Sequence, residues 1–216
     1  MLPRFTLPKF YPILDPEIAA RHGVDPIAAA EQMLEGGATI LQFRHKGFFS
    51  REVFAQLERV AQLCRDAGAL FVVNDRADLA ALTGAALHLG QDDLPPTAAR
   101  KVVGAKTLIG FSTHNERQLR AAAAEPADYL ALGPIFGTAS KQNPDPVVGL
   151  DELRRLRPLT DLPLVAIGGI TRTNARSVLD AGAGSVAIIG DLFPDHGGVR
   201  TRTEEWVALT RDTQNV

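Results

Sequence analysis

Short apolar runs alternate with longer amphipathic stretches along almost the whole chain. The apolar runs predict eight strands, within residues 10–14, 39–46, 69–75, 85–90, 106–112, 128–135, 162–170 and 185–190. The amphipathic stretches predict eight helices, within residues 25–37, 50–68, 76–84, 95–104, 115–126, 149–159, 174–184 and 203–214. In the second of these, Val53, Leu57, Val60 and Leu63 form one apolar stripe, the expected buried face.

This alternation predicts an α/β fold with a parallel sheet. Eight strand–helix units in 216 residues favour closure into a single-domain (β/α)8 TIM barrel spanning residues 1–216, since about 200 residues is the compact limit of that fold. The alternative is an open doubly wound sheet, which would normally carry a Gly-rich turn after its first strand. Here Asp15-Pro16-Glu17 follows that strand, so the barrel is the better prediction.

The overall charge argues against two classes of partner. Lys and Arg total 23 against 25 Asp and Glu, so no basic surplus indicates nucleic-acid binding. No apolar run approaches the roughly 18 residues that a membrane span needs, and the N-terminal MLPRFTLPKFYPIL lacks the apolar core of a signal peptide. The sole cysteine, Cys64, cannot form an internal disulfide and should simply pack within a helix. We therefore expect a cytoplasmic protein.

Polar residues gather where the predicted strands end, which is where TIM barrels carry their chemistry. The ends in chain order carry Gln42, Arg44 and Lys46; Asn74 and Asp75; His88, Gln91, Asp92 and Asp93; Ser112, Thr113 and His114; Thr138, Ser140 and Lys141; Gly168 and Gly169; Ile189 and Gly190. In the first group alternate residues are polar, and alternate side chains of a strand share a face. Two like charges on one face repel each other, so the arrangement is best explained if an anion binds between Arg44 and Lys46.

Each group also has a simpler interpretation. Asn74-Asp75 could cap the next helix, and Asp92-Asp93 could form a turn ahead of Pro95. Arg44 and Lys46 could be a solvated strand end. His88, flanked by apolar residues, is typical of a core histidine with satisfied hydrogen bonds, and His114 of a loop or cap residue. That all these groups fall on one rim favours a functional site.

The chemistry of this rim indicates two phosphorylated small-molecule substrates. Asp75 and Asp93 are hard oxygen ligands without a Cys or His cluster, which favours Mg²⁺. Arg44, Lys46 and Lys141 add positive charge suited to a diphosphate. The glycines after the last two strands, with the Thr138 and Ser140 hydroxyls, suit a second phosphate. Because no nucleophile or Schiff-base lysine can be placed, catalysis by positioning and leaving-group stabilisation is the expectation.

The motifs QFRHK, VVNDRADLA, LHLGQDDLP, IGFSTHN, DYLALGPIFGTASK and VAIGGI occur in this order between about Phe10 and Phe193. In this set the chain resembles the thiamine phosphate synthases. The resemblance implies a transferase on a (β/α)8 barrel that joins hydroxymethylpyrimidine diphosphate to a thiazole phosphate, with Mg²⁺ and release of pyrophosphate. It also implies that the C–O bond breaks first, giving a pyrimidine carbocation that the thiazole nitrogen captures.

Carried over motif by motif, the resemblance gives the site residues three roles. Gln42, Arg44, Lys46, Asn74, Ser112 and Lys141 would bind the pyrimidine diphosphate, with Arg44, Lys46, Ser112 and Lys141 as the catalytic residues. Asp75 and Asp93 would hold Mg²⁺. Thr138, Ser140, Gly169, Ile189 and Gly190 would cradle the thiazole phosphate.

The chain departs from the family pattern at three positions. His45 stands where Glu is common. It alternates with Arg44 and Lys46 along the strand, so its side chain should point out of the barrel. Ser140 replaces a Thr and keeps the hydroxyl. Gly190 replaces a Ser, which removes one side-chain hydrogen bond to the thiazole phosphate. The segment 142–149, with Pro144 and Pro146, should form an ordered rim loop.

Three other functions fit the same fold. A TenI-like thiazole tautomerase would act on thiazole phosphate alone, without a diphosphate or metal site, so Lys46, Asp75, Asp93 and Lys141 argue against it. A non-catalytic thiazole phosphate-binding paralogue would not need the metal carboxylates. Another phosphosugar enzyme would need a general base or Schiff-base lysine on the rim. The sequence leaves open a homo-oligomer and a preference for a carboxylated thiazole.

Overall fold

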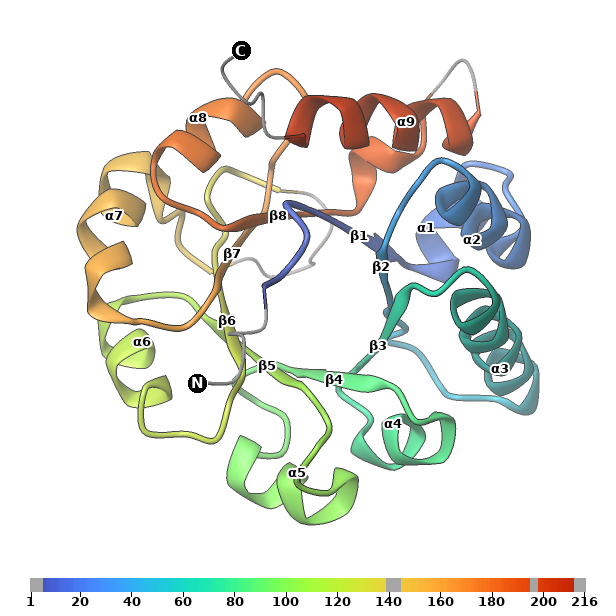
Figure 1. Cartoon of the computed structure of the whole chain (residues 1–216), viewed down its shortest axis with the longest axis horizontal. Helices are drawn as coiled ribbons and strands as arrows, with labels where there is room; N and C mark the ends of the chain where they lie inside the picture. Colours follow the sequence, from blue (N-terminus) through green and yellow to red (C-terminus); the bar gives the residue numbers. More distant parts are fainter. Residues whose placement is uncertain (1–5, 139–144, 195–197, 212–216) are drawn as a thin grey trace.

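The computed structural model describes residues 6–138, 145–194 and 198–211, and its eight strands close into one parallel barrel (Figure 1). The strands are β1 Phe10–Leu14, β2 Ile40–Phe43, β3 Leu70–Asn74, β4 Ala86–Leu89, β5 Ile109–Thr113, β6 Tyr129–Leu132, β7 Leu164–Ile167 and β8 Ser185–Ile188. Each strand pairs in parallel with the next, and β8 pairs with β1. The predicted single-domain TIM barrel is confirmed, and the open sheet is wrong.

Helices surround the barrel as an outer ring (Figure 1). They are α1 Pro16–Arg21, α2 Pro26–Glu35, α3 Arg51–Asp66, α4 Ala77–Thr83, α5 Pro96–Val103, α6 Glu116–Ala122, α7 Gly149–Leu156, α8 Ala175–Asp180 and α9 Val199–Thr210, with short 3-10 turns η1 Arg157–Leu159 and η2 Gly190–Leu192. Each of the eight predicted helices is present. The sequence pattern did not predict α1, whose six residues are too few to show a helical period, and α9 begins four residues earlier than expected.

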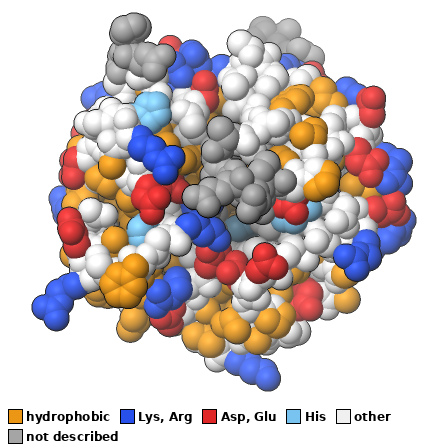
Figure 2. All heavy atoms as spheres, turned by 180° about the vertical axis from the view of Figure 1, so that it is seen from behind, with side chains coloured by type: hydrophobic (Ala, Val, Ile, Leu, Met, Phe, Trp, Pro, Cys, Tyr) orange, Lys and Arg blue, Asp and Glu red, His pale blue; other side chains and the backbone are white. Residues whose placement is uncertain are grey.

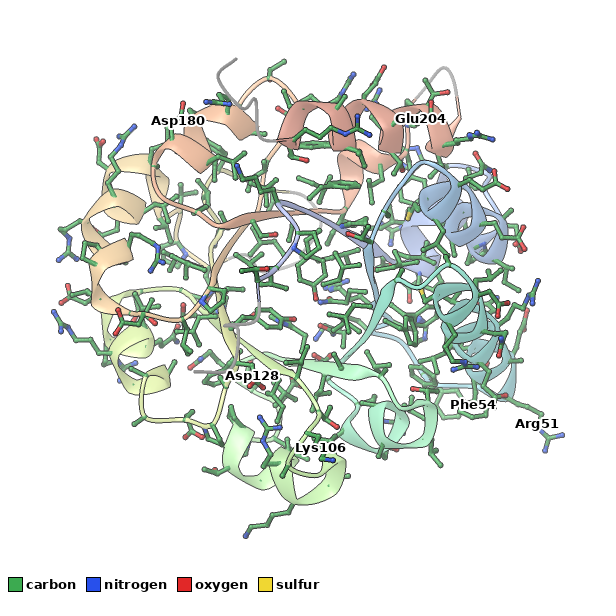
Figure 3. All side chains as sticks on the ribbon, in the orientation of Figure 1. Arg51, Phe54, Lys106, Asp128, Asp180 and Glu204 are labelled. Atoms are coloured by element: carbon green, nitrogen blue, oxygen red, sulfur yellow. The ribbon has the colours of Figure 1, made fainter. Side chains whose placement is uncertain are left out.

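Two hydrophobic cores follow from the alternation of side chains along each strand. Outward-facing residues pack against the helices in one large cluster. Inward-facing residues fill the barrel itself; they are Tyr11, Ile13, Ile40, Val72, Ala86, Tyr129, Ala131, Val165 and Ala187. Figure 3 shows side chains occupying the ring of strands, whereas Arg51 and Glu204 point away from it. The interior of the barrel is therefore filled with side chains and is not a channel, and its top can form the floor of a site.

Local signals explain several element ends. The Ser50 hydroxyl accepts a hydrogen bond from the Val53 amide at the start of α3, and Asn115 caps α6 in the same way. Cys64 is fully buried in α3, and burial raises the pKa of its thiol to about 12, as expected for packing. Within the described residues, none of the helices combines the length and apolar character needed to cross a bilayer.

Candidate active site

A cavity of about 750 Å³ lies at the carboxyl ends of the strands. It is lined by every described residue of the predicted site: Gln42, Arg44, Lys46, Asn74, Asp75, Asp93, Ser112, Thr138, Gly169, Ile189 and Gly190. Two predicted residues, Ser140 and Lys141, lie outside the described part of the chain. Seen from the side opposite to Figure 1, acidic, basic and histidine side chains gather around the centre of the molecule (Figure 2).

The two cations after β2 are each held by a carboxylate. Lys46 Nζ lies 2.5 Å from Asp75 Oδ2, and Arg44 Nη1 lies 2.5 Å from Asp15 Oδ2. The Asp15 side chain is buried and also accepts hydrogen bonds from the first amides of α1, those of Glu17 and Ile18. The cap of α1 thus fixes the Arg44 guanidinium, a role for Asp15 that the sequence did not indicate.

Asp75 and Asp93 form a close carboxylate pair. Burial, together with the neighbouring Asp93, raises the pKa of Asp75 to about 6, and Lys46 opposes this rise. Asp93 Oδ2 accepts a hydrogen bond from the Gly90 amide at 2.7 Å, which aims it across the cavity mouth. Two crowded hard-oxygen ligands with one lysine between them fit a divalent cation. The described residues contain no cluster of three metal-ligating side chains, so other oxygens would have to complete the coordination shell.

The simpler interpretation of Asn74 and Asp75 as a helix cap is wrong. Arg76 occupies the N-cap position of α4, and no side chain caps that helix. Asp75 adopts the left-handed conformation, with φ of 65°, which is costly for a residue other than glycine. Asn74 is 8 % exposed, and its Nδ2 has no hydrogen-bond partner among the described residues. An unpaired buried amide costs roughly 1–3 kcal/mol, so a ligand oxygen at this position would relieve it.

The floor of the cavity carries neutral polar groups. His88 is buried, with Nδ1 3.1 Å from the Tyr129 hydroxyl and Nε2 2.9 Å from Ser112 Oγ. Burial lowers the pKa of His88 to about 4, so the ring is neutral at physiological pH. The prediction of a satisfied core histidine is confirmed, although this histidine also lines the cavity.

On the opposite wall, the loops after β6 and β7 pack closely together. The Phe136 amide donates to the Gly168 carbonyl at 3.0 Å. Gly169 has φ of +63°, and a Cβ there would lie 2.5 Å from the Gly137 carbonyl oxygen. Only glycine fits that approach. By contrast, a Cβ on Gly190 would meet nothing within 4 Å, so the space for a side chain is present at this position.

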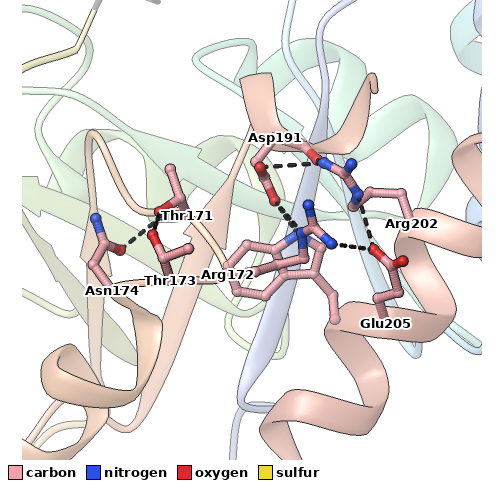
Figure 4. A network of polar contacts seen from close by, with 8 residues as sticks. Thr171, Arg172, Thr173, Asn174, Asp191, Arg202 and Glu205 are labelled. Atoms are coloured by element: carbon pink, nitrogen blue, oxygen red, sulfur yellow. Dashed lines mark hydrogen bonds and ion pairs between the residues drawn. The ribbon is translucent and has the colours of Figure 1, made fainter. Parts of the chain in front are cut away.

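A network of charged residues holds the turn after β8 in place (Figure 4). Asp191 Oδ2 accepts from Trp206 Nε1 at 2.9 Å and pairs with Arg172 at 3.3 Å, and Asp191 Oδ1 pairs with Arg202 at 3.2 Å. Asp191 directly follows Gly190 in η2, whose first amides have no partner within the turn. This network fixes the turn after β8, whose residues Ile189 and Gly190 line the cavity. The sequence did not reveal the network.

Two further histidines considered in the sequence analysis, His45 and His114, behave largely as expected. His45 does not line the cavity; its ring meets Phe49 edge-on and its Nε2 lies 3.1 Å from the Phe48 carbonyl oxygen. The prediction that it points away is confirmed. His114 follows β5 in a loop, with Nδ1 2.6 Å from the Gly133 carbonyl, and it also forms part of the cavity wall. Of the predicted rim loop, residues 142–144 lie outside the described part.

Known proteins resemble this chain over nearly its full length. The profile of the family described as thiamine monophosphate synthase matches residues 10–192. The thiamine-phosphate synthase of Koribacter versatilis is 48 % identical over 94 % of this chain and 96 % of its own. That of Chlorobium phaeovibrioides is 47 % identical over 76 % of this chain and 79 % of its own. Among solved structures, a thiamine phosphate pyrophosphorylase from Pyrococcus furiosus superposes with a TM-score of 0.83 at 32 % identity, over 96 % of this chain and 98 % of its own.

Proposed function

The chain belongs to the thiamine monophosphate synthase family, and on that premise we propose how its cavity joins hydroxymethylpyrimidine diphosphate to a thiazole phosphate. Thiamine-phosphate synthase, a transferase of thiamine biosynthesis, is the function that the family membership gives. One observation carries the proposal. The described residues suited to a diphosphate and those suited to a single phosphate line opposite parts of the same cavity.

The diphosphate side comprises β2, β3 and the loop after β4. Arg44 and Lys46 would bind the diphosphate oxygens and stabilise the negative charge that develops as pyrophosphate leaves. The unpaired Asn74 amide supports a contact to the same group, and Gln42 and Ser112 would bind the pyrimidine from the floor. Lys141, which we also assign to the diphosphate, lies outside the described residues.

The thiazole phosphate would lie against the loops after β6, β7 and β8. Thr138 would donate a hydroxyl, and the backbone at Gly169, Ile189 and Gly190 would supply amide donors. Ser140, assigned to the same phosphate, lies outside the described residues. With both substrates held this way, the C–O bond can break first and the thiazole nitrogen can then capture the pyrimidine carbocation, so no protein nucleophile is needed.

Mg²⁺ is the cofactor that the carboxylate pair supports. Asp75 and Asp93 would hold it; burial and the neighbouring Asp93 raise the pKa of Asp75 to about 6, and a bound divalent cation would favour its ionised form. When bound, the ion would neutralise charge on the departing pyrophosphate.

The TenI-like tautomerase is the alternative of the same fold. It would have no use for the Lys46–Asp75 pair or for Asp93, yet all three residues line the cavity. A cytoplasmic enzyme acting on phosphorylated small molecules is what we propose here, and the oligomeric state stays open.

The proposal is tested by pyrophosphate release from purified protein given both substrates and Mg²⁺, with EDTA and Asp93→Ala as controls. Release that requires both substrates and the metal, and that Asp93→Ala abolishes, is expected. Isomerisation of the thiazole phosphate without any pyrophosphate release would instead establish the tautomerase.

A further inference from the structure

A continuous chain of hydrogen bonds crosses the cavity floor between two of the assigned substrate ligands. Gln42 Nε2 donates to the Tyr11 hydroxyl at 2.9 Å, and this hydroxyl lies 2.9 Å from that of Tyr129. The Tyr129 hydroxyl lies 3.1 Å from His88 Nδ1, and His88 Nε2 lies 2.9 Å from Ser112 Oγ. Five strands contribute one residue each, and the Tyr11 and Tyr129 side chains at its centre are 1 % exposed.

The barrel is shaped to admit the middle of this chain. Gly110 in β5 leaves the space that the Tyr129 ring occupies, because a Cβ there would lie 2.1 Å from the ring's Cζ and 2.4 Å from its hydroxyl oxygen. Glycine inside a strand often marks such a close approach. The His88 ring stacks on the Tyr129 ring with centroids 5.6 Å apart, and the Tyr11 ring meets the Tyr129 ring edge-on with centroids 6.2 Å apart.

The hydrogens along the chain must all point the same way. Gln42 donates to Tyr11, so the Tyr11 hydroxyl hydrogen is left to donate to Tyr129, its other partner among the described residues. The Tyr129 hydroxyl then donates to His88 Nδ1, which requires the neutral ring to carry its hydrogen on Nε2 and to donate to Ser112. Ser112 Oγ, already an acceptor, keeps its own hydrogen for the cavity.

We propose that Tyr11, Tyr129 and His88 are positioning residues that fix the polarity of Gln42 and Ser112 together. This inference rests on the proposed function and deepens it. With the chain intact, the Gln42 amide presents its oxygen to the cavity, which suits an amino group. Ser112 presents a donor, which suits a ring nitrogen or a diphosphate oxygen. The floor thereby selects an amino-substituted pyrimidine over an oxo-substituted one, whose donors and acceptors are exchanged.

The tautomer of His88 gives a test that does not depend on activity. In ¹⁵N-labelled protein, with the His88→Gln variant used to assign the signals, we expect hydrogen on Nε2 and none on Nδ1. Tyr129→Phe should produce a mixture of tautomers, and Tyr11→Phe should also weaken the preference for hydrogen on Nε2, because the Tyr129 hydroxyl then no longer accepts from Tyr11 and can either donate to His88 or accept from it. A ring protonated on Nδ1 in the wild-type protein would overturn the proposal.

Discrimination between two pyrimidine substrates tests whether the hydrogen-bond chain sets substrate specificity. For the wild-type protein, kcat/KM for the aminopyrimidine diphosphate is compared with that for its 4-oxo analogue, and the same ratio is measured for Tyr129→Phe and Tyr11→Phe. We expect this ratio to fall by at least about tenfold in both variants. Val178→Ala, which removes methyl groups from the outer core in α8, should lower the melting temperature and keep the ratio.

Loss of activity on both pyrimidines by the same factor in Tyr129→Phe, with the ratio unchanged, would mean a merely structural role and overturn the proposal. If the wild-type protein released no pyrophosphate from either pyrimidine, the proposed function would fail on its own. The tautomer measurement would still decide whether the hydrogen-bond chain has the proposed direction.

Discussion

The ammonium group of Lys46 and the carboxylate of Asp75 lie 2.5 Å apart, so a cation assigned to the diphosphate and a carboxylate assigned to the metal neutralise each other. Binding of a magnesium diphosphate would exchange these partners, giving Asp75 to the metal and Lys46 to the phosphate oxygens. The Lys46 side chain is 52 % exposed, which leaves it free to swing over that short distance. The metal-free protein thus keeps this partly buried carboxylate paired until the substrate arrives.

Replacing Lys46 with alanine should damage turnover far more than folding. Removing a cation that stabilises a leaving group should lower kcat for pyrophosphate release on the order of 10²-fold. Because the lysine is half exposed, the free energy of unfolding should change by only about 0.5 kcal/mol. Arg59→Ala is the matched control, since Arg59 is equally exposed and paired with Glu31 at 3.5 Å, away from the cavity. A Lys46→Ala protein that is unfolded would indicate a structural role.

The raised pKa of Asp75 predicts an acid limit on metal binding. Its carboxyl titrates near pH 6 in the metal-free protein and must be ionised to hold Mg²⁺. At subsaturating Mg²⁺, kcat/KM should therefore fall as the pH drops through about 6, and raising the Mg²⁺ concentration should move this midpoint to lower pH. If the midpoint did not change with the Mg²⁺ concentration, the titration would not be linked to metal binding.

The same carboxyl should lower the stability of the metal-free protein as the pH rises. The folded state holds its proton up to about pH 6, whereas an unfolded Asp releases it near 3.8. Between these values the folded state binds more protons, so the free energy of unfolding falls with increasing pH. Denaturant unfolding in EDTA should show this fall, and Asp75→Asn should reduce it. An unchanged slope in Asp75→Asn would assign the effect to another group.

Gly190→Ser should strengthen binding of the thiazole phosphate. A side chain at this position meets open space, and a hydroxyl there can donate to a phosphate held by the turn after β8. One added hydrogen bond of about 1 kcal/mol corresponds to roughly a fivefold lower KM for that substrate. The KM for the pyrimidine diphosphate should stay the same, and Gly190→Ala should give no gain. A fall in both KM values would contradict the assignment.

Gly169→Ala should cost more than the conformational strain of its backbone. Gly68 has a similar φ of +65° but open space around its Cβ position, so Gly68→Ala measures the strain alone, about 1–2 kcal/mol. At Gly169 a clash with the Gly137 carbonyl is added. Urea unfolding should show a larger loss for Gly169→Ala, accompanied by a higher KM for the thiazole phosphate. Equal losses in the two variants would remove the argument for a close-packed phosphate wall.

The sequence predicted the barrel and its rim because both follow from periodicity. Parallel strands end on the same side, so polar residues at strand ends had to meet even though they are far apart in the chain. The alternation of Gln42, Arg44 and Lys46 placed all three on the inner face, and they line one cavity. Residue type and position also suggested Asp75 and Asp93 as metal ligands, and that role stays a prediction.

What the sequence could not predict depends on pairs that only the fold brings together. In the sequence, Asp15 stood out only as part of the segment after the first strand, and its contact with Arg44 requires β1 and β2 to be neighbours. Tyr11 and Tyr129, 118 residues apart, read as ordinary strand aromatics, and nothing local marks their hydroxyls as partners. Asp191 drew no attention either, since its two arginines come from different elements.

The rim of the barrel is proposed to bind a diphosphate and Mg²⁺ as a coupled pair. Calorimetric titration of the purified protein with the pyrimidine diphosphate, with Mg²⁺ and then with EDTA, tests it most directly when repeated on Asp75→Asn. The account predicts that Mg²⁺ tightens binding by at least about tenfold in the wild-type protein and has little effect in the variant. Equal affinity with and without Mg²⁺ in the wild-type protein, or the same Mg²⁺ effect in Asp75→Asn, would contradict it.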